Sequence, residues 1–322
     1  MIVPILIALA AGCASALMFA SIVSGALISL LLFYLAPLPL MVAALGWGAL
    51  GAAIGGLVGA IGLGLVFSFA YGIAFAITVA APACWLGHLA LLARASEQQP
   101  ASPAPTVAPT LEWYPVGRII VWAAGFAALT TMAALLTLGT DSASIAEGLR
   151  SGLQRALGSR DGASADTDRL IDALATVAPS AAATIAMLTL TLNLWLAARI
   201  TATSGRLQRP WPDLRTATLP PTTLAVLSLA IGLSFAGGIL ALIGATVTAA
   251  LVVAYGLVGA ATLHTLTLPA RHRGFVLSST YALIVIFMWP AVMLILLGIG
   301  DAVVGLRRRY YQRRSLTPPD PN

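Results

Sequence analysis

Residues 35–64 read LAPLPLMVAALGWGALGAAIGGLVGAIGLG, and this stretch decides how the chain folds. Pro37 and Pro39 precede an apolar run in which Gly51, Gly55 and Gly59 recur every fourth residue. Residues four apart share one helix face, and glycine inside a helix costs about 0.5–1 kcal/mol relative to alanine. Close backbone approach between membrane helices compensates for that cost. The stretch therefore predicts a helix-packing seam at the three glycines, next to a proline break.

Composition places the chain in a lipid bilayer. Of its 322 residues, 59% are hydrophobic and 9% are charged, whereas about 25% are charged in an ordinary soluble domain. No Asp, Glu, Lys or Arg occurs in residues 1–93, a length that accommodates several spans of about 20 residues each. We therefore expect an all-α fold, a polytopic transmembrane helical bundle with about eight or nine membrane segments.

The composition changes along the chain and indicates four parts. They are Gly-rich N-terminal transmembrane helices (1–93), a Pro-rich linker (94–116), C-terminal transmembrane helices (117–306), and a basic segment with a disordered tail (307–322). Apolar runs place helices at 3–20, 22–35, 39–62, 65–92, 117–139 and 180–198, with a turn at 36–40, two spans between 216 and 270, and a last run at 275–300. The first helix lacks the basic flank of a secretory signal and is expected to be retained.

All 17 basic residues are arginines, and the net charge is +6. Because no basic patch is interleaved with aromatic residues, we expect no nucleic-acid partner. Arginines at membrane edges instead predict a multi-pass protein of the bacterial inner (plasma) membrane, with membrane lipids as partners. Nine crossings would put the arginine-rich connector 199–221 and the arginines after 306 on opposite faces, against the positive-inside rule. Pro290 could divide the last run into two short halves and remove the conflict, so the number of crossings stays open.

Most of the acidic residues lie in residues 141–172, which predicts an extramembrane insertion. Ser144 and Glu147 fit a capping box, and apolar residues then follow every fourth position, at Ile145, Leu149, Leu153 and Leu157. This pattern predicts an amphipathic helix of about four turns. A second helix is expected from about 166 toward Pro179. The pair either caps the bundle at the membrane surface or forms a mobile lid over a substrate path.

Few groups could carry chemistry. The chain has no lysine, no HExxH, no GxSxG and no paired intramembrane carboxylates, so we expect no enzyme and no cofactor. Cys13 and Cys84 lie in apolar sequence, and His264 has no partner at ligand spacing, so no metal site is expected. Asn193 stands in the apolar string LTLTLNLWLAARI, where its amide either makes an interhelical hydrogen bond or contacts a ligand.

Several features together resemble the uncharacterised YybS-type membrane proteins of bacteria. They are the Pro37-Leu38-Pro39-Leu40 turn, the Gly-rich helix after it, the long loop after the fifth span, Asn193 before an Arg-rich connector, and the series Tyr281, Pro290, Leu297-Gly298, Asp301 and Arg307. The N-terminal part of that family is distantly similar to the S components of energy-coupling-factor vitamin transporters. The resemblance implies a solute-binding bundle without identifying a vitamin.

Two functions follow as hypotheses. The first is a binding or transport subunit for a small, vitamin-like solute, in which the glycine seam and the break at Pro37 and Pro39 form a pocket and Asn193 is a contact. Since the chain has no ATPase, transport would need an energising module as partner or would be passive. The alternative is a scaffold or assembly protein of the cell envelope, whose 141–172 insertion docks another protein.

Overall fold

The computed structural model describes residues 2–95, 111–157 and 165–315, and these residues are almost entirely helical. Most of the predicted linker and the predicted disordered tail lie outside the described residues. Within these described ranges, seven helices are long and apolar enough to cross a membrane: Val3–Ser24, Leu27–Trp47, Ala49–Val66, Phe69–Leu91, Val116–Leu136, Ala165–Thr203 and Gly238–Leu266. The all-α membrane fold is thus confirmed, and the chain is an integral membrane protein.

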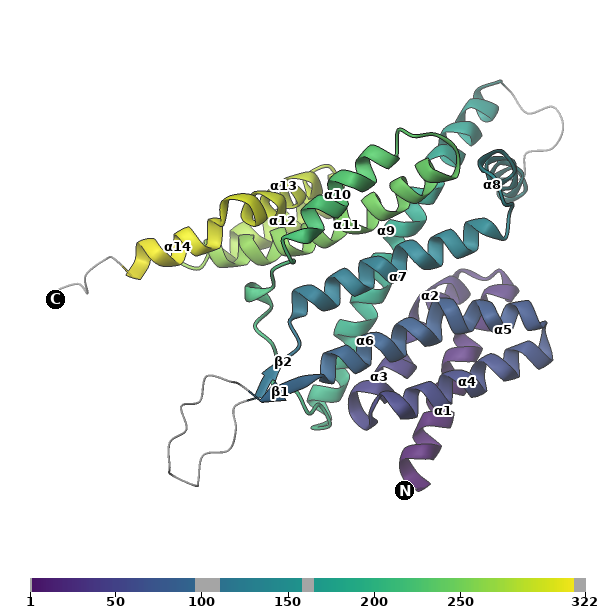
Figure 1. Cartoon of the computed structure of the whole chain (residues 1–322), viewed down its shortest axis with the longest axis horizontal. Coiled ribbons are helices and arrows are strands. Elements are labelled where there is room, and N and C mark those ends of the chain that lie inside the picture. The colour runs from purple at the N-terminus through teal and green to yellow at the C-terminus, as the bar shows by residue number, and fades with distance from the viewer. Residues whose placement is uncertain (1, 96–110, 158–164, 316–322) are drawn as a thin grey trace. The chain divides into compact units, whose positions relative to one another are not determined.

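The contacts divide the chain into two compact units. Unit 1 comprises Met1–Phe126 and Leu188–Pro212, and unit 2 comprises Ala127–Met187 and Asp213–Asn322. Unit 1 begins with α1 (Ile2–Ala20), η1 (Ser21–Ser24), α2 (Leu27–Leu35), α3 (Pro37–Trp47), α4 (Ala49–Val66), α5 (Phe69–Phe75), η2 (Ala76–Ala80) and α6 (Ala81–Leu91) (Figure 1). The short strands β1 (Ala93–Ala95) and β2 (Leu111–Trp113) pair antiparallel before α7 (Val116–Leu136).

The predicted turn at 36–40 was wrong. Ala36 keeps right-handed helical angles (φ −54°, ψ −34°), and α3 begins directly at Pro37. Proline is tolerated in the first helical turn, where its missing N–H has no intrahelical acceptor, so Leu27–Trp47 is one span. The chain reverses instead at Gly48, whose φ of 99° suits glycine. The predicted single helix 39–62 is therefore two helices, α3 and α4.

The glycine repeat of α4 packs against α1. A Cβ atom on Gly55 would overlap the carbonyl oxygen of Ala8, and one on Gly59 would lie 2.9 Å from the carbonyl oxygen of Gly12. Gly12 faces α4 in the same way, since its own Cβ would overlap the Gly55 carbonyl oxygen. Gly51 has only an ordinary contact, 3.8 Å from the Ala8 Cβ atom. The close approach is thus concentrated at three of these glycines.

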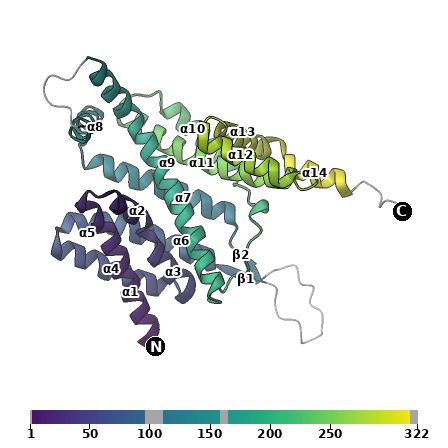
Figure 2. The same cartoon turned by 180° about the vertical axis from the view of Figure 1, so that it is seen from behind.

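Unit 2 contains α8 (Ser142–Ala156), the first part of α9 (Ala165–Thr203), η3 (Leu214–Thr216), α10 (Thr222–Leu233), α11 (Gly238–Leu266), α12 (Arg273–Phe287), α13 (Ala291–Val304) and α14 (Leu306–Ser315). Helices α11 and α13 lie side by side (Figures 1 and 2). They cross at glycines, because a Cβ on Gly259 would overlap the Leu294 carbonyl oxygen and one on Gly298 the Tyr255 carbonyl oxygen.

The helices predicted to end near Pro179 and to begin at 180 are one continuous helix, α9, with Pro179 inside it. At about 1.5 Å per residue, its 39 residues exceed the hydrocarbon thickness of about 30 Å. Its first turn holds Asp166 and Asp168. The acidic end of α9 therefore extends out of the membrane.

Unit 2 shows how the last apolar run is divided. The run is divided at Met288, whose φ is 55°, and Pro290, giving two helices of 15 and 14 residues. Arg307, after the second helix, donates hydrogen bonds to the carbonyl oxygens of Arg215 (2.5 Å) and Ala217 (2.9 Å). Residues 215–217, shortly before α10, and the segment after α13 therefore lie at the same end of this unit, an arrangement that agrees with the positive-inside rule.

Candidate functional sites

Asn193 lies in the core of unit 1, on the part of α9 that belongs to that unit. Its side chain is 1% exposed. The amide nitrogen donates to the carbonyl oxygen of Tyr34 on α2 and to that of Thr189 one turn earlier on α9, both at 2.8 Å. The interhelical hydrogen bond expected for Asn193 is therefore present, and it reaches the residue three positions before Pro37.

Two prolines alter the backbone hydrogen bonding on either side of Tyr34. Proline has no N–H, so Pro37 and Pro39 cannot donate the usual bonds to the carbonyls of Phe33 and Leu35. The N–H of Ala36 instead bonds the Phe33 carbonyl oxygen at 3.2 Å. Pro37 is buried and Pro39 is half-buried. The structure thus brings Asn193 close to the proline-containing part of the span Leu27–Trp47.

The amide oxygen of Asn193 has no hydrogen-bond donor within the described residues. The orientation of the amide is fixed by its partners, because a flip would place this oxygen against two carbonyl oxygens. An unsatisfied buried polar group costs about 1–3 kcal/mol. Asn193 therefore presents an acceptor in the core of unit 1 that a donor group could stabilise.

Helix α1 connects this region with the glycine seam, since it packs on both α3 and α4. It also carries Ser15, a fully buried residue whose hydroxyl has no partner among the described residues. Neither Ser15 nor Gly12 was predicted from the sequence. The run of small residues in ALAAGCASA, residues 8–16, was a signal for both, because small residues mark close helix contacts in membranes.

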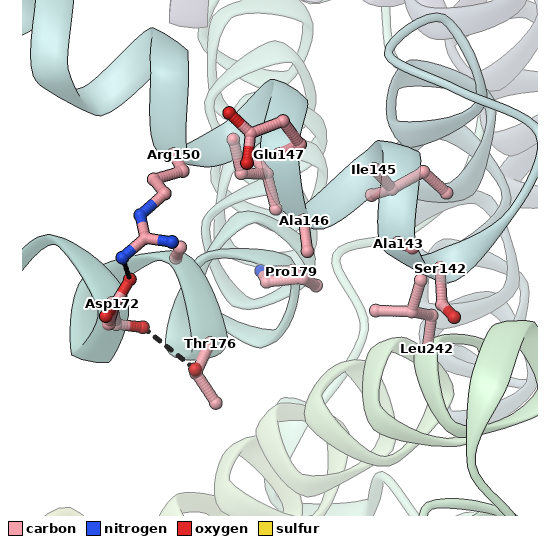
Figure 3. A pocket seen from close by; sticks show the side chains of 12 residues that line it. Ser142, Ala143, Ile145, Ala146, Glu147, Arg150, Asp172, Thr176, Pro179 and Leu242 are labelled. Atoms are coloured by element: carbon pink, nitrogen blue, oxygen red, sulfur yellow. Dashed lines mark hydrogen bonds and ion pairs between the residues drawn. The ribbon is translucent and has the colours of Figure 1, made fainter.

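A pocket of about 420 Å³ lies in unit 2, between α8, the first part of α9 and α11. Its lining combines apolar residues with a few charged ones. Figure 3 shows Glu147, Arg150 and Asp172 on one side of the pocket, and Ile145 and Leu242 on the other. This volume falls within the range of about 300–1,000 Å³ that is usual for small-molecule sites.

Helix α8 shapes the pocket through its cap and its buried face. The capping box predicted at Ser144 and Glu147 was wrong: Asp141 caps the helix by accepting the N–H groups of Ala143 and Ser144, both at 3.0 Å. The hydrogen bonds that the N–H and the hydroxyl of Ser144 donate to the Asp141 carboxylate have the largest effect on its pKa and, with that of the Ala143 N–H, hold it below the ordinary value. Ile145 is fully buried, and Glu147 is left free to line the pocket.

In each unit, arginine side chains make cation–π contacts or ion pairs near the segments that connect the helices. In unit 1, the guanidinium carbon of Arg199 lies 4.5 Å from the Trp211 ring centroid and that of Arg206 lies 5.5 Å from the Trp47 centroid, distances typical of cation–π contacts. In unit 2, Arg307 and Asp301 form a buried ion pair. Arg307 was expected to contact anionic lipid, but it is 6% exposed and paired.

The described residues contain no group of three His, Cys, Asp or Glu side chains that could hold a metal ion. Comparison with protein-family models, with curated proteins and with solved structures finds no match for this chain. The resemblance to YybS-type proteins therefore stays a prediction, as does the expectation that the protein is not an enzyme.

Proposed function

We propose that this integral membrane protein is a binding or transport subunit for a small, vitamin-like solute in the bacterial inner membrane. The observation that carries the proposal is the buried amide oxygen of Asn193, which has no donor within the described residues. Polar backbone in a membrane is tolerated where it is buried in protein or lines a cavity. The span Leu27–Trp47 is continuous, but Pro37 and Pro39 donate no backbone hydrogen bonds in it, and this supports the proposal.

The chemistry of Asn193 defines what such a solute carries. Its amide nitrogen already donates hydrogen bonds to the carbonyl oxygens of Tyr34 and Thr189. Only the amide oxygen is therefore available to a ligand, as an acceptor. A solute bound there offers an N–H or O–H donor on a partly apolar body. Energy for transport comes from a separate module, or the movement is passive, because the chain has no lysine for a phosphate-binding loop.

The test is native mass spectrometry of gently solubilised full-length protein. We expect one non-lipid small molecule of reproducible mass, displaced by a chemical relative. Asn193→Leu, which keeps the side-chain size, should fold and lose that molecule. Thr201→Val is the matched control, because Thr201 is buried on the same helix and its hydroxyl bonds only local carbonyl oxygens.

Three results would contradict the proposal. The wild type could retain only lipid, Asn193→Leu could retain the solute, or Thr201→Val could lose the solute equally. A protein that co-purifies through residues 141–172 in place of a solute would favour the alternative, a scaffold of the cell envelope.

A further inference from the structure

We infer that the pocket between α8, α9 and α11 is a binding site for a small organic cation with an apolar body, such as an amine. The site stands on unit 2 alone and does not depend on Asn193. Its twelve lining residues include three charged ones, Glu147, Arg150 and Asp172. The charge of the ligand depends on which of these three groups is already neutralised by a partner.

The positive charge in the pocket is already paired. The guanidinium of Arg150 contacts a carboxylate oxygen of Asp172 at 2.5 Å, and the two side chains come from different helices, α8 and α9. Glu147, one turn before Arg150 on α8, has no hydrogen bond or ion pair with the rest of the described chain. The pocket therefore carries one negative charge in excess, which favours a cationic ligand.

The helix N-terminus beside the pocket does not offer an anion site. Ser142 and Ala143, in the first turn of α8, belong to the lining, and a helix N-terminus by itself attracts anions. The carboxylate of Asp141 already accepts the N–H groups of Ala143 and Ser144. An incoming anion would thus meet both Asp141 and the free Glu147.

The apolar side of the pocket limits which cations fit. Ile145 is fully buried, Pro179 is buried, and Leu242 closes the pocket from α11. Figure 3 shows these residues beside the space, with the charged groups on the other side. A fully hydrated metal ion gains nothing from such a wall, whereas an amine with a hydrocarbon part buries apolar surface there.

The position of the pocket within unit 2 agrees with this ligand class. Leu242 lies in the first turns of α11, at the end opposite to His264 and to the arginine-rich segments around Arg215 and Arg307. Residues 141–172 hold six acidic residues and four arginines. By the positive-inside rule, this acidic end faces away from the cytoplasm, so an external cation is attracted to it.

The experiment uses the full-length protein in dodecyl maltoside, an uncharged detergent, and isothermal titration with 2-phenylethylammonium. Its uncharged relative 2-phenylethanol has nearly the same shape and is the ligand control. We expect saturable binding of the ammonium ion, and binding of the alcohol at least about tenfold weaker. Glu147→Gln should raise the Kd for the ammonium ion about tenfold.

Two variants complete the design. Asp168→Asn removes an exposed negative charge of α9 that does not line the pocket, and it should change the Kd less than about twofold. Ala146→Trp should fill the pocket and abolish binding, and its exposed position keeps folding intact. The inference is overturned if the wild type does not bind, if the alcohol binds as tightly as the ammonium ion, if Glu147→Gln and Asp168→Asn weaken binding equally, or if Ala146→Trp still binds.

Discussion

Units 1 and 2 are held together by different forces. In unit 1, α1 and α4 approach through Gly12, Gly55 and Gly59, and the atom nearest to each of these positions is a backbone carbonyl oxygen of the facing helix. Unit 2 also has a glycine crossing, but it adds a buried ion pair between Asp301 and Arg307. The difference follows the length of the membrane segments. The first four spans, all in unit 1, have 22, 21, 18 and 23 residues, whereas three apolar helices of unit 2 have only 12, 15 and 14 residues.

Short helices need polar tethers because they bury less surface. Thr223 on α10 and Tyr255 on α11 share a hydrogen bond of 2.8 Å, and His264 on α11 bonds Tyr281 on α12 at 2.9 Å. Long spans can instead rely on van der Waals contact along a seam of small residues. The comparison predicts that unit 2 is most sensitive to loss of a charge and unit 1 to added volume.

The largest loss of stability is expected from the substitution Arg307→Leu in unit 2. The Arg307 guanidinium bonds the Asp301 carboxylate and two backbone carbonyl oxygens, so its loss leaves a buried, uncompensated carboxylate. Removing one partner of a buried pair costs about 3–5 kcal/mol. Equilibrium unfolding in detergent should show a loss of this size in the free energy of unfolding.

The neighbouring Arg308 provides the control for Arg307, because it is exposed. Arg308→Leu should change the free energy of unfolding by less than about 0.5 kcal/mol. The double variant Asp301→Leu/Arg307→Leu should recover part of the loss, since it removes the buried charge altogether. Equal losses in the two single arginine variants would show that the ion pair does not hold unit 2.

The second largest loss of stability is expected from the substitution Gly55→Ala in unit 1. The added methyl would overlap the Ala8 carbonyl oxygen, so α1 and α4 must separate. Overpacking of this kind costs about 1–3 kcal/mol. Gly51→Ala is the matched control: its methyl would make only an ordinary contact, at 3.8 Å, and the gain in helix propensity should leave stability unchanged or raised by up to about 1 kcal/mol. Thermal unfolding in detergent distinguishes the two, and equal shifts in Tm would exclude the seam at Gly55.

Local patterns predicted part of this architecture from the sequence. The absence of charge in residues 1–93 gave the membrane class, and the four-residue spacing at Ile145 gave the amphipathic helix α8. The site of the turn after α2 was mispredicted, because Pro37 fits a first helical turn and the reversal needs the positive φ of Gly48. Proline alone therefore did not locate the break.

Partners far apart in sequence could not be predicted. Asn193 bonds the carbonyl of Tyr34, and Arg307 bonds the carbonyl of Ala217. Backbone carbonyl groups occur at every residue, so nothing in the sequence identifies which of them accepts such a bond. The helices are also apolar on all sides, so periodicity does not reveal which face of α1 carries Gly12 toward α4.

The smallest effect concerns α8, whose N-terminus is held by a surface charge. Asp141 accepts the N–H groups of Ala143 and Ser144, and these bonds lower its pKa from the ordinary value of 3.8. A carboxyl group with a lowered pKa in the folded state stabilises that state above its unfolded pKa. We expect this stabilisation to be complete above about pH 4 and to fall as the pH drops through the lowered pKa.

Amide hydrogen exchange in α8, corrected for the intrinsic pH dependence of exchange, measures this effect. Protection at Ala143 and Ser144 should be constant from pH 7 to about pH 4 and decrease below it, as protonation weakens Asp141 as an acceptor. Asp141→Asn keeps a capping oxygen but does not titrate, so its protection should be independent of pH. The same acid-induced loss in the Asn variant would show that the titrating group is not Asp141. The stability of unit 2 would then depend on a further charged group at its surface, as it depends on the ion pair in its interior.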